Sequence, residues 1–460
     1  MAASSLKFTV RRRQPELVVP AIPTPHEFKQ LSDIDDQEGL RFQIPVIQFY
    51  RHDQKTLMSG GRDPCRVIRD ALSRTLVYYY PFAGRLREGP NRKLSVECTG
   101  EGVLFIEADA DVELDQFGEM LQPPFPQLED LLYDVPGSGG VVDAPLLLIQ
   151  VTRLLCGGFI FALRLNHTMS DAAGLVQFMN AVAETARNRD PSVLPVWERE
   201  RLNARTPPRV SCVHREYEDQ RQHHQPEGTT SSSAALNLIP LDDMAHRSFF
   251  FGREHMASMR SRIPPHLRNS CSAFDILTAS LWRCRTIALS PHPDQEMRVI
   301  CITDARSRFH PPLPKGYYGN GFAFPAAVST AGRLCGRPLG YAVGLVKAAK
   351  GAVTEEYMRS VSDLMVVKGR PHFTVVGTYL VSDLTRAGFM EVDFGWGKPG
   401  EKGIVVPVCL PGPAMERFVA EIESLMKTSN NIEEEEEEEE EEKPSNGSLY
   451  SDPQLIRSAL

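Results

Sequence analysis

The spacing of apolar residues changes within the first half of the chain, from a strand pattern to a helical one. Residues 146–151 are nearly all apolar, which predicts a strand buried on both faces, and residues 158–165 predict a second strand. Beyond them the apolar residues recur at helical spacing, at Leu175, Phe178, Met179, Val182 and Ala186. Ser170 or Asp171 would cap this helix, so the residues in between form a strand-to-helix turn.

The rest of the chain continues this alternation. Helical spacing predicts further helices over 66–77, 272–289, 339–358 and 414–426. Short apolar runs predict strands over 249–252, 299–303, 374–381 and 404–410. Because strands and helices alternate through both halves, we expect an α/β protein with mixed α+β character.

The length of the chain indicates more than one domain. A chain of 460 residues exceeds a single compact core, so two domains are expected. The stretch 187–246 is poor in apolar residues and rich in Pro, Gln, His, Ser and Arg, which is typical of a crossover between domains. We therefore predict an N-terminal domain over 1–190, a linker over 191–246, a C-terminal domain over 247–428 and a tail over 429–460.

Most of the net charge lies in that tail. The formal net charge is -8, but residues 433–442 are an unbroken run of ten glutamates. Without them the chain carries 51 basic and 49 acidic residues, a net charge of +2. The run is typical of a solvated, disordered tail. The nearly neutral body gives no basis for nucleic-acid binding.

The cysteines indicate a reducing compartment. None of the nine forms a C-x-x-C pair, and five lie in apolar runs: Cys98, Cys156, Cys284, Cys301 and Cys409. We expect reduced core thiols in a cytosolic protein. The N-terminus has no long apolar leader segment, and no uncharged stretch reaches membrane-spanning length.

Four histidines of the crossover could suggest a metal site. They are irregularly spaced and have no accompanying cysteine or carboxylate pattern: His214, His223, His224 and His246. Solvated loop histidines are therefore expected, and no metal is predicted.

The strand-to-helix turn carries the strongest candidate chemistry. His167 lies at the end of the second strand, and Asp171 follows four residues later. A neutral imidazole with a pKa near 6.5 can accept a proton from a hydroxyl group at cellular pH. Asp171 could bond to His167, or pair with an arginine and hold the shape of the loop. The simpler alternative is a helix-capping aspartate beside a hydrogen-bonded histidine.

Two further segments have both structural and functional interpretations. Residues 304–308 are Asp-Ala-Arg-Ser-Arg, which suits a strand-end turn, exposed charge, or an arginine paired with a buried carboxylate. Residues 393–397 are Asp-Phe-Gly-Trp-Gly, which suits a tight turn with packed rings.

Together and in this order, these residues resemble the plant BAHD acyltransferases, which transfer acyl groups from coenzyme A thioesters. The H-x-x-x-D motif of that family matches residues 167–171, and its D-F-G-W-G motif matches 393–397. Its Y-Y-P-x-A-G-R and D-x-R…G-Y-x-G-N patterns match residues 79–85, and 304–306 with 316–320. The likeness runs from about residue 6 to 426. It is nearest to the alcohol acyltransferase branch, which includes benzyl alcohol O-benzoyltransferases.

The resemblance implies a two-domain fold like that of chloramphenicol acetyltransferase, with a tunnel between the domains. His167 would be the general base, and Asp171 would pair with Arg306 to shape the loop. Trp396 would help to stabilise the tetrahedral intermediate, and Ser272 would contact coenzyme A. Asp393, Gly395 and Gly397 would have structural roles.

The implied activity is acyl transfer from an acyl-CoA co-substrate to an alcohol. Benzoyl-CoA with benzyl alcohol is the favoured pair. Acetyl-CoA with aliphatic or terpenoid alcohols is an alternative. A catalytically impaired member that only binds ligand is an alternative of another class. Neither a bound cofactor nor a metal is expected, and the protein is expected to be a cytoplasmic monomer without nucleic-acid or membrane partners.

One departure from the family pattern follows the D-F-G-W-G motif. In the alcohol acyltransferase branch a longer glycine-rich connector and another strand separate this motif from the next conserved turn. Here Pro399 leads directly into Gly400, so on the order of two dozen residues are missing, enough for a loop and a strand. Loss of a strand from a packed sheet would leave an unpaired edge.

Overall fold

A computed structural model describes residues 6–52, 62–218, 243–399 and 404–427 of the chain. The strands are β1 Val10–Arg12, β2 Glu16–Val18, β3 Phe28–Gln30, β4 Gln43–Tyr50, β5 Arg85–Glu88, β6 Leu94–Glu97, β7 Val103–Ala110, β8 Leu147–Arg153, β9 Phe159–Asn166, β10 Met244–Phe251, β11 Glu296–Cys301, β12 Thr303–Asp304, β13 Phe322–Ala323, β14 Ala326–Thr330, β15 Thr378–Val381 and β16 Ile404–Pro411. The α-helices are α2 Pro64–Thr75, α3 Leu128–Leu131, α4 Ala172–Ala186, α5 Arg253–Ser261, α6 Pro265–Arg268, α7 Ala273–Leu289, α8 Ala331–Gly336, α9 Leu339–Gly351, α10 Glu355–Val367 and α11 Gly412–Met426.

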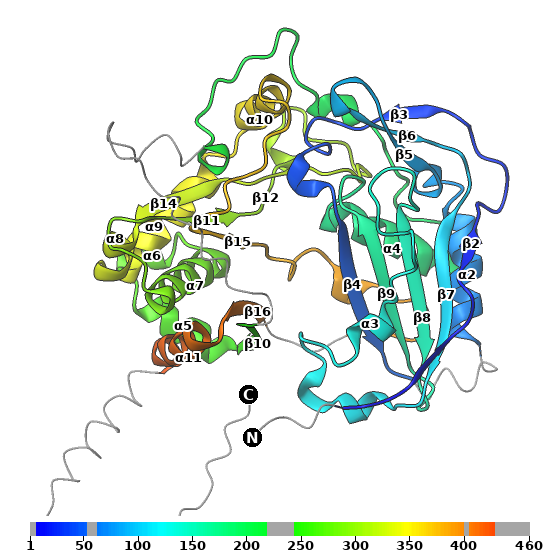
Figure 1. The fold of residues 1–460 in the computed structure, drawn as a ribbon, viewed down its shortest axis with the longest axis horizontal. Coiled ribbons are helices and arrows are strands. Elements are labelled where there is room, and N and C mark those ends of the chain that lie inside the picture. Colours follow the sequence, from blue (N-terminus) through cyan, green and yellow to red (C-terminus); the bar gives the residue numbers. More distant parts are fainter. Residues whose placement is uncertain (1–5, 53–61, 219–242, 400–403, 428–460) are drawn as a thin grey trace, which may run out of the picture.

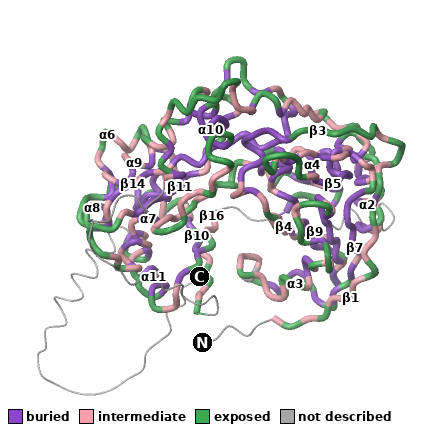
Figure 2. The backbone as a smooth tube through the Cα atoms, turned by 45° about the horizontal axis from the view of Figure 1, so that its top comes forward, coloured by how far each residue is buried: buried purple, intermediate pink, exposed green. Residues whose placement is uncertain are grey.

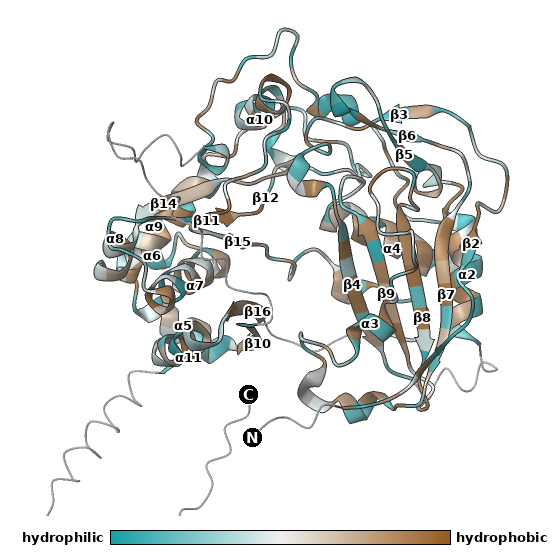
Figure 3. Ribbon diagram, viewed as in Figure 1, coloured by the Kyte–Doolittle hydropathy of each residue, from teal (hydrophilic) through white to brown (hydrophobic). Residues whose placement is uncertain are grey.

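A six-stranded sheet dominates the N-terminal half. Its strand order is β1-β7-β8-β9-β4, with β2 also paired to β7, and only β7 and β8 run parallel. The strands β4, β7, β8 and β9 are largely apolar along their length (Figure 3). In β9 the side chains alternate between two cores: Phe161 and Leu163 pack in the main one, whereas Ile160 and Ala162 face the opposite side. The sheet is therefore buried on both faces, as predicted for residues 146–151.

The C-terminal half has its own core. A three-stranded sheet in the order β14-β11-β15 packs with α7, α8 and α9, and a separate two-stranded sheet joins β10 to β16 beside α11 (Figure 1). Trp282 of α7 lies in the middle of this second core and is fully buried. Buried positions thus form separate groups in the two halves (Figure 2).

Most of the predicted elements are present, with shifted ends. The helix predicted over 339–358 is wrong, because the chain forms two helices there. α9 ends at Gly351, and Thr354 caps α10 by accepting a hydrogen bond from the Tyr357 amide. Glycine disfavours the helix interior, and threonine is a favoured N-cap, so this pair of residues separates the two helices.

The segment after β15 returns to the N-terminal half. Figure 1 shows the chain crossing from β15 towards β4 and α4. Phe394 and Trp396 belong to the main core of the large sheet, and the Tyr50 hydroxyl of β4 donates a hydrogen bond to the Val392 carbonyl. The two halves are therefore not contiguous in sequence. The domain bounds predicted at 190, 246 and 428 stay a prediction.

Of the four edge strands in the two C-terminal sheets, β15 and β16 lie on either side of the predicted gap. Within the described residues β15 pairs only with β11, and β16 pairs only with β10. Both edges flank residues 381–404, which contain the point where the sequence predicts a missing strand. The interrupted sheet is consistent with that prediction.

The prediction that the cysteines of the apolar runs are core thiols is wrong for two of the five. Cys98, Cys284 and Cys301 are buried free thiols, but Cys156 and Cys409 are exposed, because Cys156 lies in the turn between β8 and β9 and Cys409 on the outward side of β16.

His214 is buried rather than solvated. Its two ring nitrogens lie 2.8 Å from the Ser360 hydroxyl and 3.2 Å from the Glu216 carboxylate. His246 is exposed, and His223 and His224 lie outside the described residues. The described segments contain no cluster of residues suited to a metal ion. Their helices include none long and apolar enough to cross a membrane.

Candidate functional site

His167 lies where the two halves of the molecule meet. It follows the last residue of β9, and its amide donates a hydrogen bond of 2.8 Å to the Phe42 carbonyl, just before β4. The imidazole lies edge-on to the Phe42 ring, with 5.5 Å between centroids, and 6.0 Å from the Phe322 ring of β13. The predicted strand-to-helix turn is confirmed, because β9 ends at Asn166 and α4 begins at Ala172.

The surroundings of His167 keep its imidazole neutral. The ring is partly exposed, while its Nδ1 atom is buried and has no hydrogen-bond partner among the described residues. Burial lowers the pKa of His167 below its ordinary value of 6.5, and the nearby Asp171 charge opposes this only partly. The Nε2 atom forms no hydrogen bond with the described residues and, unlike Nδ1, is not fully buried. A neutral imidazole with one accessible nitrogen can accept a proton near pH 7.

Asp171 is held by Arg306 and does not bond to His167. The two guanidinium Nη atoms of Arg306 donate to separate oxygens of the Asp171 carboxylate, each at 2.7 Å. The amides of Gly174 and Gly321 donate to the same carboxylate, both at 3.0 Å. Burial alone would raise the pKa of Asp171, but Arg306 and these amides hold it below its usual range. Asp171 also caps α4, so it fixes the turn that carries His167.

The turn packs directly on the loop 316–320 of the C-terminal half. The Ser170 hydroxyl donates a hydrogen bond of 2.7 Å to the Tyr318 carbonyl. A Cβ atom on Gly174 would lie 2.2 Å from that same oxygen, so only glycine permits this approach. The first turn of α4 is thus fitted against the opposite half of the molecule.

A second buried ion pair lies on the other side of the turn, and the sequence did not point to it. Asp35 and Arg199 are fully buried and 2.6 Å apart. Arg199 donates to the Met169 carbonyl, and Asn320 links Asp35 to the His167 carbonyl. Asn320 belongs to a recognised motif, but Arg199 lies in the predicted linker. No spacing rule connects these residues, so the sequence alone gave no signal for the pair.

Ser272 caps α7. Its hydroxyl accepts from the Asp275 amide at 3.2 Å and donates to the Asp275 carboxylate at 2.8 Å. Lys350 lies 2.7 Å from the other oxygen of that carboxylate. These contacts give Ser272 a structural role, and its contact with coenzyme A stays a prediction.

The Asp-Phe-Gly-Trp-Gly motif forms a tight turn. The Asp393 carboxylate accepts hydrogen bonds from the amides of Gly395 and Gly397, at 2.7 and 3.0 Å. Both glycines have positive φ angles, 108° and 94°, which other residues rarely adopt. This geometry supports the structural role expected for Asp393, Gly395 and Gly397.

Trp396 lies at the other end of β9 from His167. Its ring packs edge-on to Phe159, with 5.4 Å between centroids. Phe159 begins β9, and His167 follows the end of that eight-residue strand, so the two sites are roughly 25 Å apart. This position gives no support to a role of Trp396 in stabilising a reaction intermediate, and that role stays a prediction. The motif crosses back to the far end of the sheet, and the sequence pattern does not reveal that.

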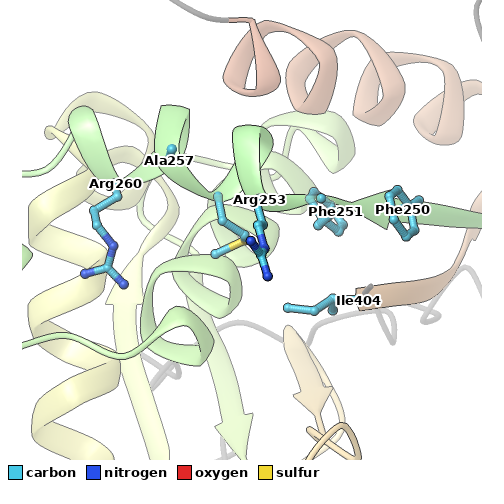
Figure 4. A pocket seen from close by; sticks show the side chains of 8 residues that line it. Phe250, Phe251, Arg253, Ala257, Arg260 and Ile404 are labelled. Atoms are coloured by element: carbon cyan, nitrogen blue, oxygen red, sulfur yellow. The ribbon is translucent and has the colours of Figure 1, made fainter. Parts of the chain in front are cut away.

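An open pocket of about 650 Å³ lies elsewhere, between β10, α5 and the start of β16 (Figure 4). Its lining is mainly apolar, with Phe250, Phe251 and Ile404, and Arg253 and Arg260 also line it. The described residues that line it include no histidine, cysteine or carboxylate.

Comparison with a family model shows to which family the chain belongs. The model described as "Transferase family" matches residues 7–410. The chain belongs to this family, the BAHD acyltransferases. The acyltransferase class predicted from the sequence is thereby confirmed.

Curated relatives agree with this assignment. A benzyl alcohol O-benzoyltransferase of Petunia hybrida is 63% identical over 453 residues, covering 92% of this chain and 95% of the relative. A protein of the same name from Nicotiana tabacum is 62% identical with the same coverage. Alcohol acyl transferase 1 (allele GSa) of Malus domestica is 55% identical, over 90% of this chain and 94% of the relative.

Solved structures show the fold. Vinorine synthase matches 91% of this chain and 98% of its own, with a TM-score of 0.68 and 21% identity. TRI101 of F. sporotrichioides, complexed with coenzyme A and T-2, matches 86% and 97%, with a TM-score of 0.61 and 15% identity. The predicted chloramphenicol acetyltransferase-like fold is confirmed.

Proposed function

We propose that this BAHD acyltransferase transfers a benzoyl group from benzoyl-CoA to the hydroxyl of benzyl alcohol. Two relatives above 60% identity that carry this activity in their names support the choice of substrates. The observation that carries the reaction type is His167, a neutral and partly exposed imidazole at the junction of the two halves.

The proposed reaction is a single displacement. The Nε2 atom of His167 removes the proton of the alcohol as its oxygen attacks the thioester carbonyl carbon. The tetrahedral intermediate collapses, the carbon–sulfur bond breaks, and the leaving thiolate takes the proton from His167 to give free coenzyme A. A positioned base contributes about 10²–10⁴-fold to such a step. Alignment of the two substrates at the junction supplies the orientation effect.

Coenzyme A enters as part of a co-substrate, and Ser272 at the start of α7 is the residue proposed to contact it. No metal or bound cofactor takes part in the proposed scheme. The monomeric state, the cytoplasmic location and the absence of nucleic-acid or membrane partners, all predicted from the sequence, remain part of the proposal.

Release of free thiol from acyl-CoA tests the activity. The purified chain is assayed with benzoyl-CoA and acetyl-CoA, each against benzyl, aliphatic and terpenoid alcohols. Benzoyl-CoA with benzyl alcohol is expected to give the fastest release, and His167→Ala is expected to abolish it. His292→Ala is the control, because it also removes an imidazole, but one that is exposed on the surface. Full activity in His167→Ala would refute the mechanism, and preference for acetyl-CoA would favour the alternative donor.

A catalytically impaired, ligand-binding member is the second candidate. The unpaired edges of β15 and β16 favour it, because an interrupted sheet reduces the support of the C-terminal half. Coenzyme A binding measured by calorimetry, without thiol release for any alcohol, would establish this alternative. Sequencing of the transcript across codon 399 would then show whether a segment is absent from the gene product.

A further inference from the structure

Asp35 and Arg199 form an ion pair with no access to solvent. Their side chains are 0% and 1% exposed, and Arg199 Nη1 lies 2.6 Å from Asp35 Oδ1. The second oxygen of Asp35 accepts hydrogen bonds from the amide and hydroxyl of Ser32, at 3.0 and 2.6 Å. Buried charges persist only where partners compensate their desolvation. Hydrogen bonds satisfy both oxygens of Asp35, whereas Arg199 Nε and Nη1 are buried without a hydrogen bond among the described residues, so Arg199 depends on its charge contact with Asp35.

The pair reaches the backbone of the catalytic turn through two hydrogen bonds. Arg199 Nη2 donates to the Met169 carbonyl at 2.8 Å. The side-chain amide of Asn320 donates to Asp35 Oδ1 at 2.9 Å and to the His167 carbonyl at 2.8 Å. Both oxygens are acceptors only, so the NH₂ group of Asn320 must point at them. The orientation of the Asn320 side chain is thereby fixed.

Close packing prevents the arginine from moving. Its guanidinium lies over the rings of Trp197 and Tyr318, 4.4 and 5.2 Å from their centroids. A Cβ atom on Gly319 would lie 2.4 Å from Arg199 Nη1. Only a glycine at position 319 therefore leaves room for the guanidinium in this position.

The three residues come from different parts of the chain. Asp35 precedes the first long strand, Arg199 lies in the crossover, and Asn320 lies in the loop before β13. We propose that Asp35, Arg199 and Asn320 position the His167 main chain for catalysis, in addition to the Asp171–Arg306 pair. The Asp171–Arg306 pair fixes the helical end of the turn, whereas Asn320, held by Asp35, fixes the carbonyl of His167. Asp35, Arg199 and Asn320 are positioning residues that do not touch the substrate. The inference rests on the proposed acyl transfer.

Asn320→Ala is the direct test, because it removes the link to His167 and leaves the ion pair intact. The expected result is a fall in kcat of at least about tenfold, with KM for the acyl-CoA within about twofold, because small misplacements of a catalytic group slow the chemical step. Ser360→Ala is the matched control. Ser360 is also fully buried and contacts the amides of Ser211 and Cys212 and the His214 ring, away from His167. Ser360→Ala is expected to lower Tm by as much as Asn320→Ala does and to leave kcat unchanged.

Arg199→Lys provides a second variant that keeps the buried charge. A single ammonium cannot reproduce the two-pronged contact to Asp35 and the Met169 carbonyl, so kcat is again expected to fall without a change in KM. Folded Asn320→Ala with kcat within twofold of wild type would overturn the inference. So would equal losses of kcat in Asn320→Ala and Ser360→Ala, or failure of both site variants to fold while Ser360→Ala folds. If the wild-type chain releases no thiol, the proposed function fails instead, so the two failures are distinguishable.

Discussion

Arg306 holds Asp171 through two parallel hydrogen bonds of 2.7 Å, one to each oxygen of the carboxylate. Both side chains are largely shielded from solvent, so water cannot take the place of a lost partner. Removal of the negative charge leaves the guanidinium with only the exposed Asp304 carboxylate and the Gly319 carbonyl as partners. We therefore expect Asp171→Asn to lower the free energy of unfolding by about 3 kcal/mol. Urea denaturation followed by tryptophan fluorescence measures this loss.

The control is the second carboxylate on the same arginine. Asp304 lies 2.8 Å from Arg306 Nη1, but its side chain is 58% exposed. Exposed ion pairs contribute little, so Asp304→Asn is expected to cost less than about 1 kcal/mol. Equal losses in the two variants would contradict the view that burial makes Asp171 the essential partner.

The sequence predicted the parts of the site that local patterns encode. His167 and Asp171 lie at a change from strand to helical spacing, and Arg306 follows a buried strand, so their elements could be predicted from periodicity. Their pairing came from a family resemblance rather than from spacing. The Asp35–Arg199 pair could not be predicted, because contacts between distant segments depend on how the two halves assemble. For the same reason the sequence did not predict that Trp396 packs against Phe159.

The pH dependence of the reaction reports the surroundings of His167. Burial lowers the pKa of His167 below 6.5, and the base must be neutral. Activity is therefore expected to persist at pH 6.5 and to fall only as the pH drops through the lowered pKa. The Asp171 charge raises the pKa of His167, so Asp171→Asn should move the acid limb to still lower pH. The profile of kcat/KM between pH 5 and 8 measures both effects. An acid limb above pH 6.5 would show that His167 is not the titrating base.

Trp396 offers a test of structural against catalytic function. The side chain is 5% exposed and packs on Phe159 in the main core, far from His167. Trp396→Ala is expected to reduce the free energy of unfolding by about 3–5 kcal/mol through loss of buried area and an unfilled cavity. The kcat of the folded fraction should remain within about twofold of wild type, since no contact with the reacting groups is lost. Comparison of kcat per folded molecule, with the folded fraction taken from the unfolding curve, separates the two effects. A hundredfold fall in this corrected kcat would support a catalytic role.

Gly395 is required by its backbone conformation. Its φ angle is 108°, and its amide donates to Asp393 at the start of the turn. A side chain at such an angle costs about 1–3 kcal/mol, so Gly395→Ala should lower the stability by that amount. Gly412 is the matched control, because it begins α11, its φ angle is not positive, and a Cβ atom there would meet no neighbour. Gly412→Ala is expected to be neutral or slightly stabilising, since alanine favours the helix over glycine. Thermal unfolding of the two variants side by side measures the difference. If Gly395→Ala were as stable as Gly412→Ala, the turn would not require glycine, and the structural role of the motif would have to rest on Asp393 and the packed rings alone.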